Sequence, residues 1–93
     1  MTNISITNGK IRCDGHAGDK VACAMLTALT VNLVDNLMNR LNDNVDCTLD
    51  KGLFVLVFDR NRISPAAVVL IDSYVYSLRH LTESYPENFK IDM

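Results

Sequence analysis

Apolar and polar residues alternate along the first part of the chain, which is the pattern of a β-strand with one face buried. The apolar positions of this alternation are Ile4, Ile6, Ile11 and Cys13. Between the two pairs stands Asn8-Gly9, the preferred two-residue turn of a β-hairpin. The pattern therefore predicts an antiparallel hairpin over residues 1–14, followed by a loop of small residues up to Gly18.

A helical period replaces the alternation from about Asp19 to Leu41. Asp19 is a residue type that caps helix N-termini. Apolar residues recur at helical spacing at Ala22, Leu26, Leu29, Leu33 and Leu37. Further apolar residues widen this stripe until most of the first half of the helix is apolar: Val21, Met25, Ala28 and Val34. We expect such a helix to be covered on more than one side.

The second half of the chain repeats this order of elements. Residues 45–59 predict a hairpin that turns at 50–52, and its return strand 53–58 is apolar at every position. Ser64-Pro65 is an N-cap followed by proline at the first helical position. The helix that follows directs inward Val68, Ile71, Val75, Leu78 and Leu81. Residues 89–91 predict a short final strand.

The order ββ-α-ββ-α-(β) predicts an α+β fold, a two-layer sandwich of a mainly antiparallel sheet with two helices. No repeat or linker divides residues 1–93, so one domain is expected. The strand that is apolar on both faces has two explanations. Either the helices lie on opposite faces of the sheet, or they share one face and a second copy covers the other. We expect a homodimer, because a chain this short has a small core that gains from association.

Charge and composition limit the partners. The nine basic residues are scattered and the formal net charge is −2, which argues against nucleic acid. No uninterrupted apolar run approaches the roughly 20 residues of a membrane span, so we expect no membrane partner. The first five residues lack the basic start and apolar stretch of a secretory signal. Three cysteines cannot all pair within the chain. We therefore expect free thiols and a cytoplasmic location.

The candidate chemistry lies between the first hairpin and the first helix. Cys23 falls at the start of the helix, where backbone N–H groups and the helix dipole favour an anion and so activate a thiol. Lys20 adds to this effect, and Asp19 opposes it if its carboxylate reaches the sulfur. His16 stands seven positions before Cys23, and Gly15 and Gly18 let the loop fold back. Imidazole and thiol can then meet as general base and nucleophile.

Several supporting roles and alternatives follow from the same segment. Asp14 and Asp19 are candidates to orient His16, and the N–H groups of Ala22 and Cys23 are candidates to hold an oxyanion. Thr27 lies one turn after Cys23, and we expect its hydroxyl to form a hydrogen bond either near the Cys23 sulfur or to its own backbone carbonyl. The plain alternative is a packed cysteine beside an exposed loop histidine. Another makes zinc ligands of Cys13, His16 and Cys23. No fourth ligand is evident, so we expect no metal or cofactor. We assign Cys47 to the core, and Cys13 either to the core or, because it is close to His16, to a minor resolving or metal-binding role.

The motifs Gly15-His16-Ala17 and Val21-Ala22-Cys23-Ala24 resemble those of the ribosomal-processing cysteine proteases (Prp) of bacteria. Thr27 stands where that family usually carries serine. The resemblance implies a homodimeric α/β protease with Cys23 as nucleophile and His16 as general base. Its implied substrate is a ribosomal protein precursor that loses a short N-terminal extension, or a phage structural protein. The interval of six residues between His16 and Cys23 is shorter than usual, which is typical of a divergent or phage-derived member.

The sequence thus predicts a cysteine endopeptidase acting on a protein substrate. The alternative is a non-catalytic homodimeric binding module with the same fold.

Overall fold

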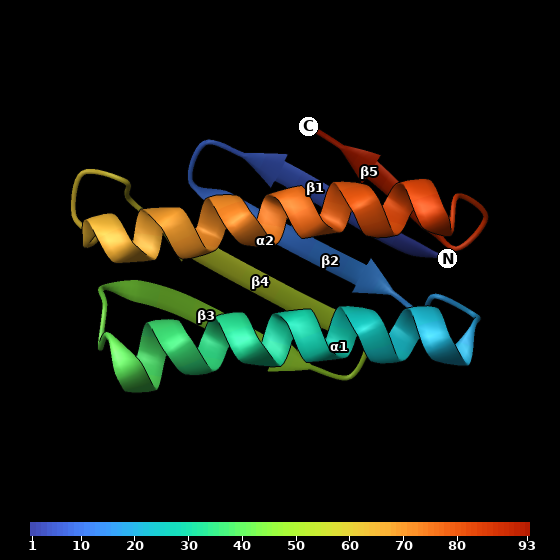
Figure 1. Ribbon diagram of the computed structural model, residues 1–93, viewed down its shortest axis with the longest axis horizontal. Coiled ribbons are helices and arrows are strands. Elements are labelled where there is room, and N and C mark those ends of the chain that lie inside the picture. Colours follow the sequence, from blue (N-terminus) through green and yellow to red (C-terminus); the bar gives the residue numbers. More distant parts are fainter.

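The computed structural model describes all 93 residues and contains one five-stranded sheet and two long helices (Figure 1). The elements are β1 (Thr2–Thr7), β2 (Lys10–Gly15), α1 (Lys20–Asp35), the π-helical turn η1 (Asn36–Arg40), β3 (Val45–Asp50), β4 (Leu53–Phe58), α2 (Pro65–Ser84) and β5 (Phe89–Asp92). The strands lie in the order β3-β4-β2-β1-β5. Every pair is antiparallel except β1 and β5. The predicted α+β fold and its element order are confirmed.

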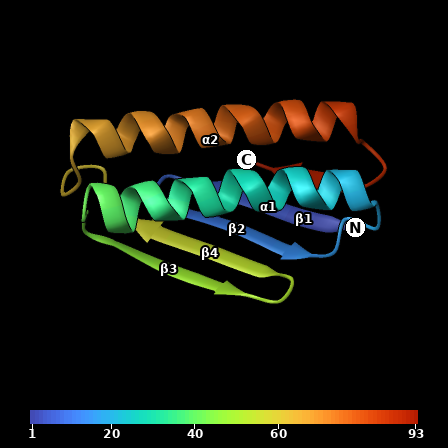
Figure 2. The ribbon, with the colours of Figure 1, turned by 60° about the horizontal axis from the view of Figure 1, so that its bottom comes forward.

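Both helices lie on the same face of the sheet, α1 toward the β3–β4 side and α2 toward the β1–β5 side (Figure 2). The alternative with helices on opposite faces is therefore wrong. On the uncovered face, Val57 is exposed while Leu53 and Val55 are half-buried. Strand β4 is thus apolar on both faces although only one face is covered within the chain.

The first hairpin forms as its alternation predicts. Ile4 lies opposite Cys13 and Ile6 opposite Ile11, with Asn8-Gly9 as the turn. Ile4, Ile11 and Cys13 point toward the helices and are buried. The period of two therefore sets which face of the hairpin joins the core.

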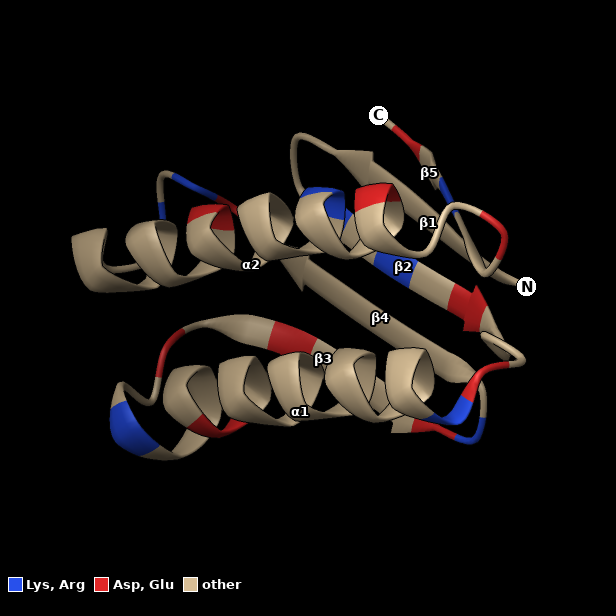
Figure 3. Cartoon of the chain, turned by 45° about the vertical axis from the view of Figure 1, so that its right-hand side comes forward, with Lys and Arg blue, Asp and Glu red and all other residues tan.

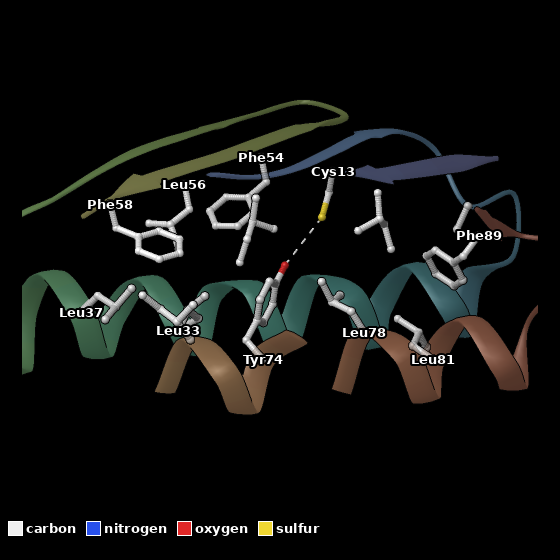
Figure 4. Close-up of a cluster of buried hydrophobic side chains, with 14 of the residues drawn as sticks. Cys13, Leu33, Leu37, Phe54, Leu56, Phe58, Tyr74, Leu78, Leu81 and Phe89 are labelled. Atoms are coloured by element: carbon white, nitrogen blue, oxygen red, sulfur yellow. Dashed lines mark hydrogen bonds between the residues drawn. The ribbon is translucent and has the colours of Figure 1, made fainter. Parts of the chain in front are cut away.

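The core fills the space between the sheet and the two helices (Figure 4). Its buried side chains include Ile4, Ile11, Phe54, Leu56 and Phe58 from the sheet and Leu33, Leu37, Ile71, Tyr74, Leu78 and Leu81 from the helices. The inward face of α2 differs slightly from the prediction, since Tyr74 is buried while Val68 and Val75 are only half-buried. The stripe 67-71-74-78-81 keeps the helical period, and the two valines lie at its flanks.

Helix α1 begins where predicted, and Asp19 accepts a hydrogen bond from the Ala22 N–H at 2.9 Å. Its far end differs, because η1 replaces the last predicted turns and the Leu41 N–H bonds to the Asn36 carbonyl. Only Ala22, Thr30 and Leu33 of α1 are buried. The helix is therefore covered on one side within this chain, not on several.

The opposite side of α1 is apolar and exposed. Val21, Met25 and Val31 keep 58%, 45% and 49% of their surface exposed. The helical stretch Lys20–Arg40 has 21 residues and contains an 18-residue window with a mean hydropathy of 1.5, so it is long and apolar enough to cross a membrane by length and composition alone. The expectation of no membrane partner considered only uninterrupted apolar runs and therefore missed this stretch. A core helix of a globular domain passes the same test, and Leu33 and Leu37 are buried in the core here.

The start of α2 is tied to the segment after η1. The Ser64 hydroxyl caps the helix by accepting from the Ala67 N–H at 3.1 Å. The Ser64 hydroxyl and N–H in turn donate to the Asp43 carboxylate at 2.6 Å and 2.9 Å. These hydrogen bonds to Ser64 hold the pKa of the Asp43 carboxyl below its usual range.

The Asp43 contact makes stability depend on pH in a defined direction. A carboxyl whose pKa is lowered on folding stabilises the protein above its unfolded pKa of 3.8 and loses that contribution as the pH falls through the folded pKa. We expect Asp43→Asn to lower the melting temperature at pH 7 and to lower it less in strong acid. Melting curves between pH 2 and 7 measure this, with Asp92→Asn as an exposed control. An equal decrease at every pH would contradict the prediction.

Candidate active site

The loop between β2 and α1 turns sharply at two glycines. Gly15 and Gly18 have φ angles of +105° and +80°, a region that side chains disfavour. A Cβ at Gly15 would also collide with the carbonyl of Met1. Both glycines therefore have the conformational role that the sequence predicts, and they turn the chain from the end of the central strand β2 to the start of α1.

His16 lies in this loop and rests on the turn of the second hairpin. A Cβ built on Gly52 would lie 3.1 Å from both Cε1 and Nε2 of His16, so the ring would have to shift by a few tenths of an ångström, and the φ of +67° at Gly52 also favours glycine. The Gly15 N–H donates to the Gly52 carbonyl at 2.8 Å and joins the two segments beside the imidazole. From the sequence, Gly52 is predicted only as a turn residue, and its contact with His16 is not.

Cys23 is the fourth residue of α1 and is exposed. Side chains in a helix lean toward its N-terminus, so the thiol leans toward the first turn and the loop. His16, Cys23 and Thr27 line the same two hollows. One is a cavity of about 450 Å³ between α1 and the sheet, and the other is a more open groove on the outer side of α1. The structure thus brings the predicted nucleophile and base to one place.

The first turn of α1 corrects one prediction. The Ala22 N–H is bound by the Asp19 carboxylate, and the Cys23 N–H donates to the Asp19 carbonyl at 2.9 Å. Both groups that were expected to hold an oxyanion are therefore already occupied. The N–H groups of Lys20 and Val21, at the first two positions of the helix, have no acceptor.

The two carboxylates predicted to orient His16 are both engaged elsewhere. Asp14 points to the uncovered face of the sheet, where Arg12 pairs with it at 3.1 Å, because neighbouring strand residues face opposite ways. Asp19 caps the helix, and His16 forms no hydrogen bond. The carboxylate that lines the cavity together with His16 is Asp50, in the hairpin turn. Its Oδ1 accepts the Lys51 N–H at 2.7 Å.

The Thr27 side chain makes neither of the two hydrogen bonds predicted as alternatives for it. In α1, the threonine whose hydroxyl forms a hydrogen bond is Thr30. The Thr30 hydroxyl is buried and lies 2.8 Å from the Tyr74 hydroxyl. The Tyr74 hydroxyl is in turn 3.8 Å from the Cys13 sulfur (Figure 4). Tyr74 thus belongs to this buried network.

The other two cysteines pack against the core, as predicted. Burial raises the pKa of the Cys13 thiol to about 11, with the Tyr74 hydrogen bond opposing the shift. Cys47 is half-buried, and its pKa is raised by burial and by the neighbouring Asp46. The zinc alternative has no support, because no three His, Cys, Asp or Glu side chains lie in a group that could hold a metal ion.

Asn88, which the sequence reading missed, holds the loop from the opposite end of the chain. Its side-chain amide donates to the Ala17 carbonyl at 2.7 Å, and its own carbonyl accepts the Thr2 N–H at 2.9 Å. Ala17 is buried directly after His16. Asn88 therefore links the loop to the start of β1, a connection across 71 residues that no local pattern signals.

We expect Asn88→Ala to loosen the loop while leaving the fold intact. The Ala17 carbonyl loses its donor, which costs about 1 kcal/mol of unfolding free energy. Amide exchange of residues 16–19 should become faster than in the wild type, as measured by hydrogen–deuterium exchange. The control is Asn39→Ala in η1, which removes an exposed hydrogen bond to Asp35 and should leave exchange in the loop unchanged. Unaltered loop exchange in Asn88→Ala would refute the prediction.

Comparison with known proteins gives a consistent result. No curated protein matches the sequence. Two solved structures of the essential ribosomal processing protease Prp from Staphylococcus aureus, one with a covalently linked product peptide and one with a substrate peptide, superpose with TM-scores of 0.80 and 0.79 at 22% and 19% identity. Both cover 98% of this chain and 95% of their own. SMU.848 from Streptococcus mutans gives 0.76 at 19% identity, covering 98% and 90%. These likenesses establish the fold.

The family itself follows from the sequence match, because residues 1–90 match the family described as cysteine protease Prp. The chain belongs to the cysteine protease Prp family.

Proposed function

We propose that this protein is a cysteine endopeptidase in which Cys23 is the nucleophile and His16 the general base. The observation that carries the proposal is the pairing of an exposed thiol and an exposed imidazole on the walls of one cavity at the N-terminus of α1. Cys13 is buried with a raised pKa, and Cys47 is half-buried. Cys23 is therefore the cysteine that a substrate carbonyl can reach.

The proposed reaction proceeds in two stages. His16 takes the proton of the Cys23 thiol, and the thiolate attacks the peptide carbonyl carbon. The carbonyl oxygen becomes an oxyanion, for which the unoccupied N–H groups of Lys20 and Val21 are the nearest helix donors in sequence. His16 then protonates the leaving amine as the C–N bond breaks. Water hydrolyses the thioester and restores the thiol.

The proposed substrate is a cytoplasmic protein with a short N-terminal extension, either a ribosomal protein precursor or a phage structural protein. Support comes from family membership and from the peptides bound in the two S. aureus structures. The competing proposal is a binding module with the same fold that does not cleave its partner. The two differ in whether an intact partner survives incubation with the wild-type protein.

We expect Cys23→Ala to abolish cleavage of an extended precursor and His16→Ala to slow it about 10²–10⁴-fold, the usual contribution of a general base. Mass spectrometry of candidate precursors from the same genome measures the cleavage. Iodoacetamide labelling at pH 7 reads the thiol directly, and Cys23 should react much faster than Cys47 only when His16 is present.

Cys47→Ser is the matched control and should retain full cleavage. If the wild type binds a precursor without cleaving it, and Cys23→Ala binds it equally well, the protein is a binding module and the protease proposal fails.

We also propose a homodimer, with the exposed side of α1 as the contact surface. Val21, Met25, Ala28 and Val31 lie on this side. No charged residue interrupts α1 between Lys20 and Asp35 (Figure 3). The uncovered face of the sheet is less suited, because it carries charged side chains such as Arg12 and Asp14 beside its valines. A second copy would remove the apolar surface of α1 from water.

Sedimentation velocity tests the dimer. We expect Met25→Lys, which places a charge in the middle of this surface, to convert a dimer into a monomer with an unchanged melting curve at low concentration. Val69→Lys on α2 is the control, since Val69 is 67% exposed on another surface. A monomeric wild type, or a Met25→Lys variant that remains dimeric, would exclude this interface.

A further inference from the structure

Helix α1, which carries Cys23, is held in place by few buried side chains. Only Ala22, Thr30 and Leu33 of its sixteen residues are buried. Between Ala22 and Thr30 every side chain is exposed or half-buried, and the cavity of about 450 Å³ separates this stretch from the sheet. The two turns of helix that contain Cys23 are therefore fixed to the core at Ala22 and again at Thr30.

The contact at Thr30 is polar, although the core around it is apolar. The Thr30 hydroxyl lies 2.8 Å from the hydroxyl of Tyr74 on α2. The Tyr74 hydroxyl lies 3.8 Å from the sulfur of Cys13 on β2 (Figure 4). All three residues are 4% exposed, and these are the two hydrogen bonds of the protein that join buried side chains. One hydroxyl thus connects three elements of the fold.

Two of these elements carry the nucleophile and the base. Cys13 stands three residues before His16, on the strand that leads into the loop. Thr30 stands seven residues after Cys23, two turns along α1 and on the same side of the helix. The Tyr74 hydroxyl therefore links the strand that precedes His16 to the helix that bears Cys23.

Stability alone gives little reason for hydroxyls at these positions. Tyr74→Phe would keep the edge-to-face contact with Phe54, whose ring centroid is 6.0 Å away. Thr30→Val would keep the shape of the side chain. Replacing both partners of a buried hydrogen bond by apolar groups of the same shape can be nearly neutral for folding. A satisfied polar network adds a defined distance and direction between the segments that it joins, and so specifies one arrangement of the core.

The network itself takes no part in proton transfer. Burial raises the pKa of Cys13 to about 11 and raises the pKa of Tyr74 as well. Both groups therefore stay neutral near pH 7, and neither competes with His16 for the proton of Cys23.

We propose that Tyr74 is a positioning residue, which sets the separation of the Cys23 thiol and the His16 imidazole by holding α1 against β2. Tyr74 does not line the cavity, so it acts through Thr30 and Cys13 and does not touch the substrate. This inference rests on the proposed protease function, because the separation matters only where His16 takes the proton of Cys23.

The double variant Tyr74→Phe/Thr30→Val separates positioning from stability. It makes both partners of the hydrogen bond apolar, so we expect a melting temperature close to that of the wild type. Alkylation of Cys23 by iodoacetamide at pH 7 should nevertheless slow about tenfold, a smaller loss than the roughly hundredfold that a displacement of about 1 Å can cause. Each single variant should lose as much reactivity as the double variant, because either change breaks the same connection.

Two further variants lower stability without breaking this connection. Thr30→Ser keeps the hydroxyl but loses a buried methyl group, so it should retain most of the alkylation rate that Thr30→Val loses, at a lower melting temperature. Ile71→Val, one turn before Tyr74 on the same buried side of α2, leaves the network intact and should react at the wild-type rate. If the alkylation rate instead follows the melting temperature across all the variants, Tyr74 has only a structural role and the proposal is overturned.

His16→Ala distinguishes failure of this inference from failure of the protease proposal. If Cys23 is alkylated equally fast with and without His16, the mechanism with His16 as base fails and the positioning role fails with it. If His16→Ala is slow while the double variant reacts like the wild type, the protease proposal stands and the positioning role of Tyr74 is excluded. Slow alkylation in both, with the melting temperature of the double variant unchanged, is the expected result.

Discussion

The backbone hydrogen bond from Gly15 to Gly52 is the contact on which the site depends. It joins the end of β2 to the turn of the second hairpin at 2.8 Å and so extends the pairing of β2 with β4. His16 then has a surface to rest on, and glycine suits this position because its φ is +67° and a side chain there would crowd the ring. The sheet therefore sets the position of the imidazole, and the N-cap of α1 sets that of the thiol.

Three features of the fold have no evident benefit for stability. The Thr2 hydroxyl is buried without a partner, one side of α1 leaves large apolar residues in water, and two N–H groups of its first turn have no acceptor. All three lie around the His16–Cys23 pair or on the helix that carries Cys23. Proteins tolerate such local costs where binding or catalysis needs them. Their position on α1 and beside it favours a functional role without reference to the family match.

The sequence predicts what local rules decide and fails where distant segments meet. Both hairpins, the Asp19 and Ser64 caps and the inward residues of β1 and β2 follow from alternation, turn residues and capping preferences. The prediction that Asp14 orients His16 was wrong because strand alternation directs its side chain to the uncovered face of the sheet. The expected oxyanion donors were wrong because the cap uses one of them and the first helical hydrogen bond uses the other. Asn88 was missed because its contact with Ala17 spans 71 residues.

The site is assembled from both ends of the chain. The parallel pairing of β1 with β5 places Thr2 opposite Phe89, and the Thr2 N–H bonds to the Asn88 carbonyl. Thr2 then lines the cavity and Asn88 holds the loop beside His16. Contacts between residues this far apart in sequence form only after a long loop has closed, which is costly in chain entropy. Cys23 and His16 are close in sequence, but the pocket around them also needs Thr2 of β1, Cys13 of β2 and the second hairpin.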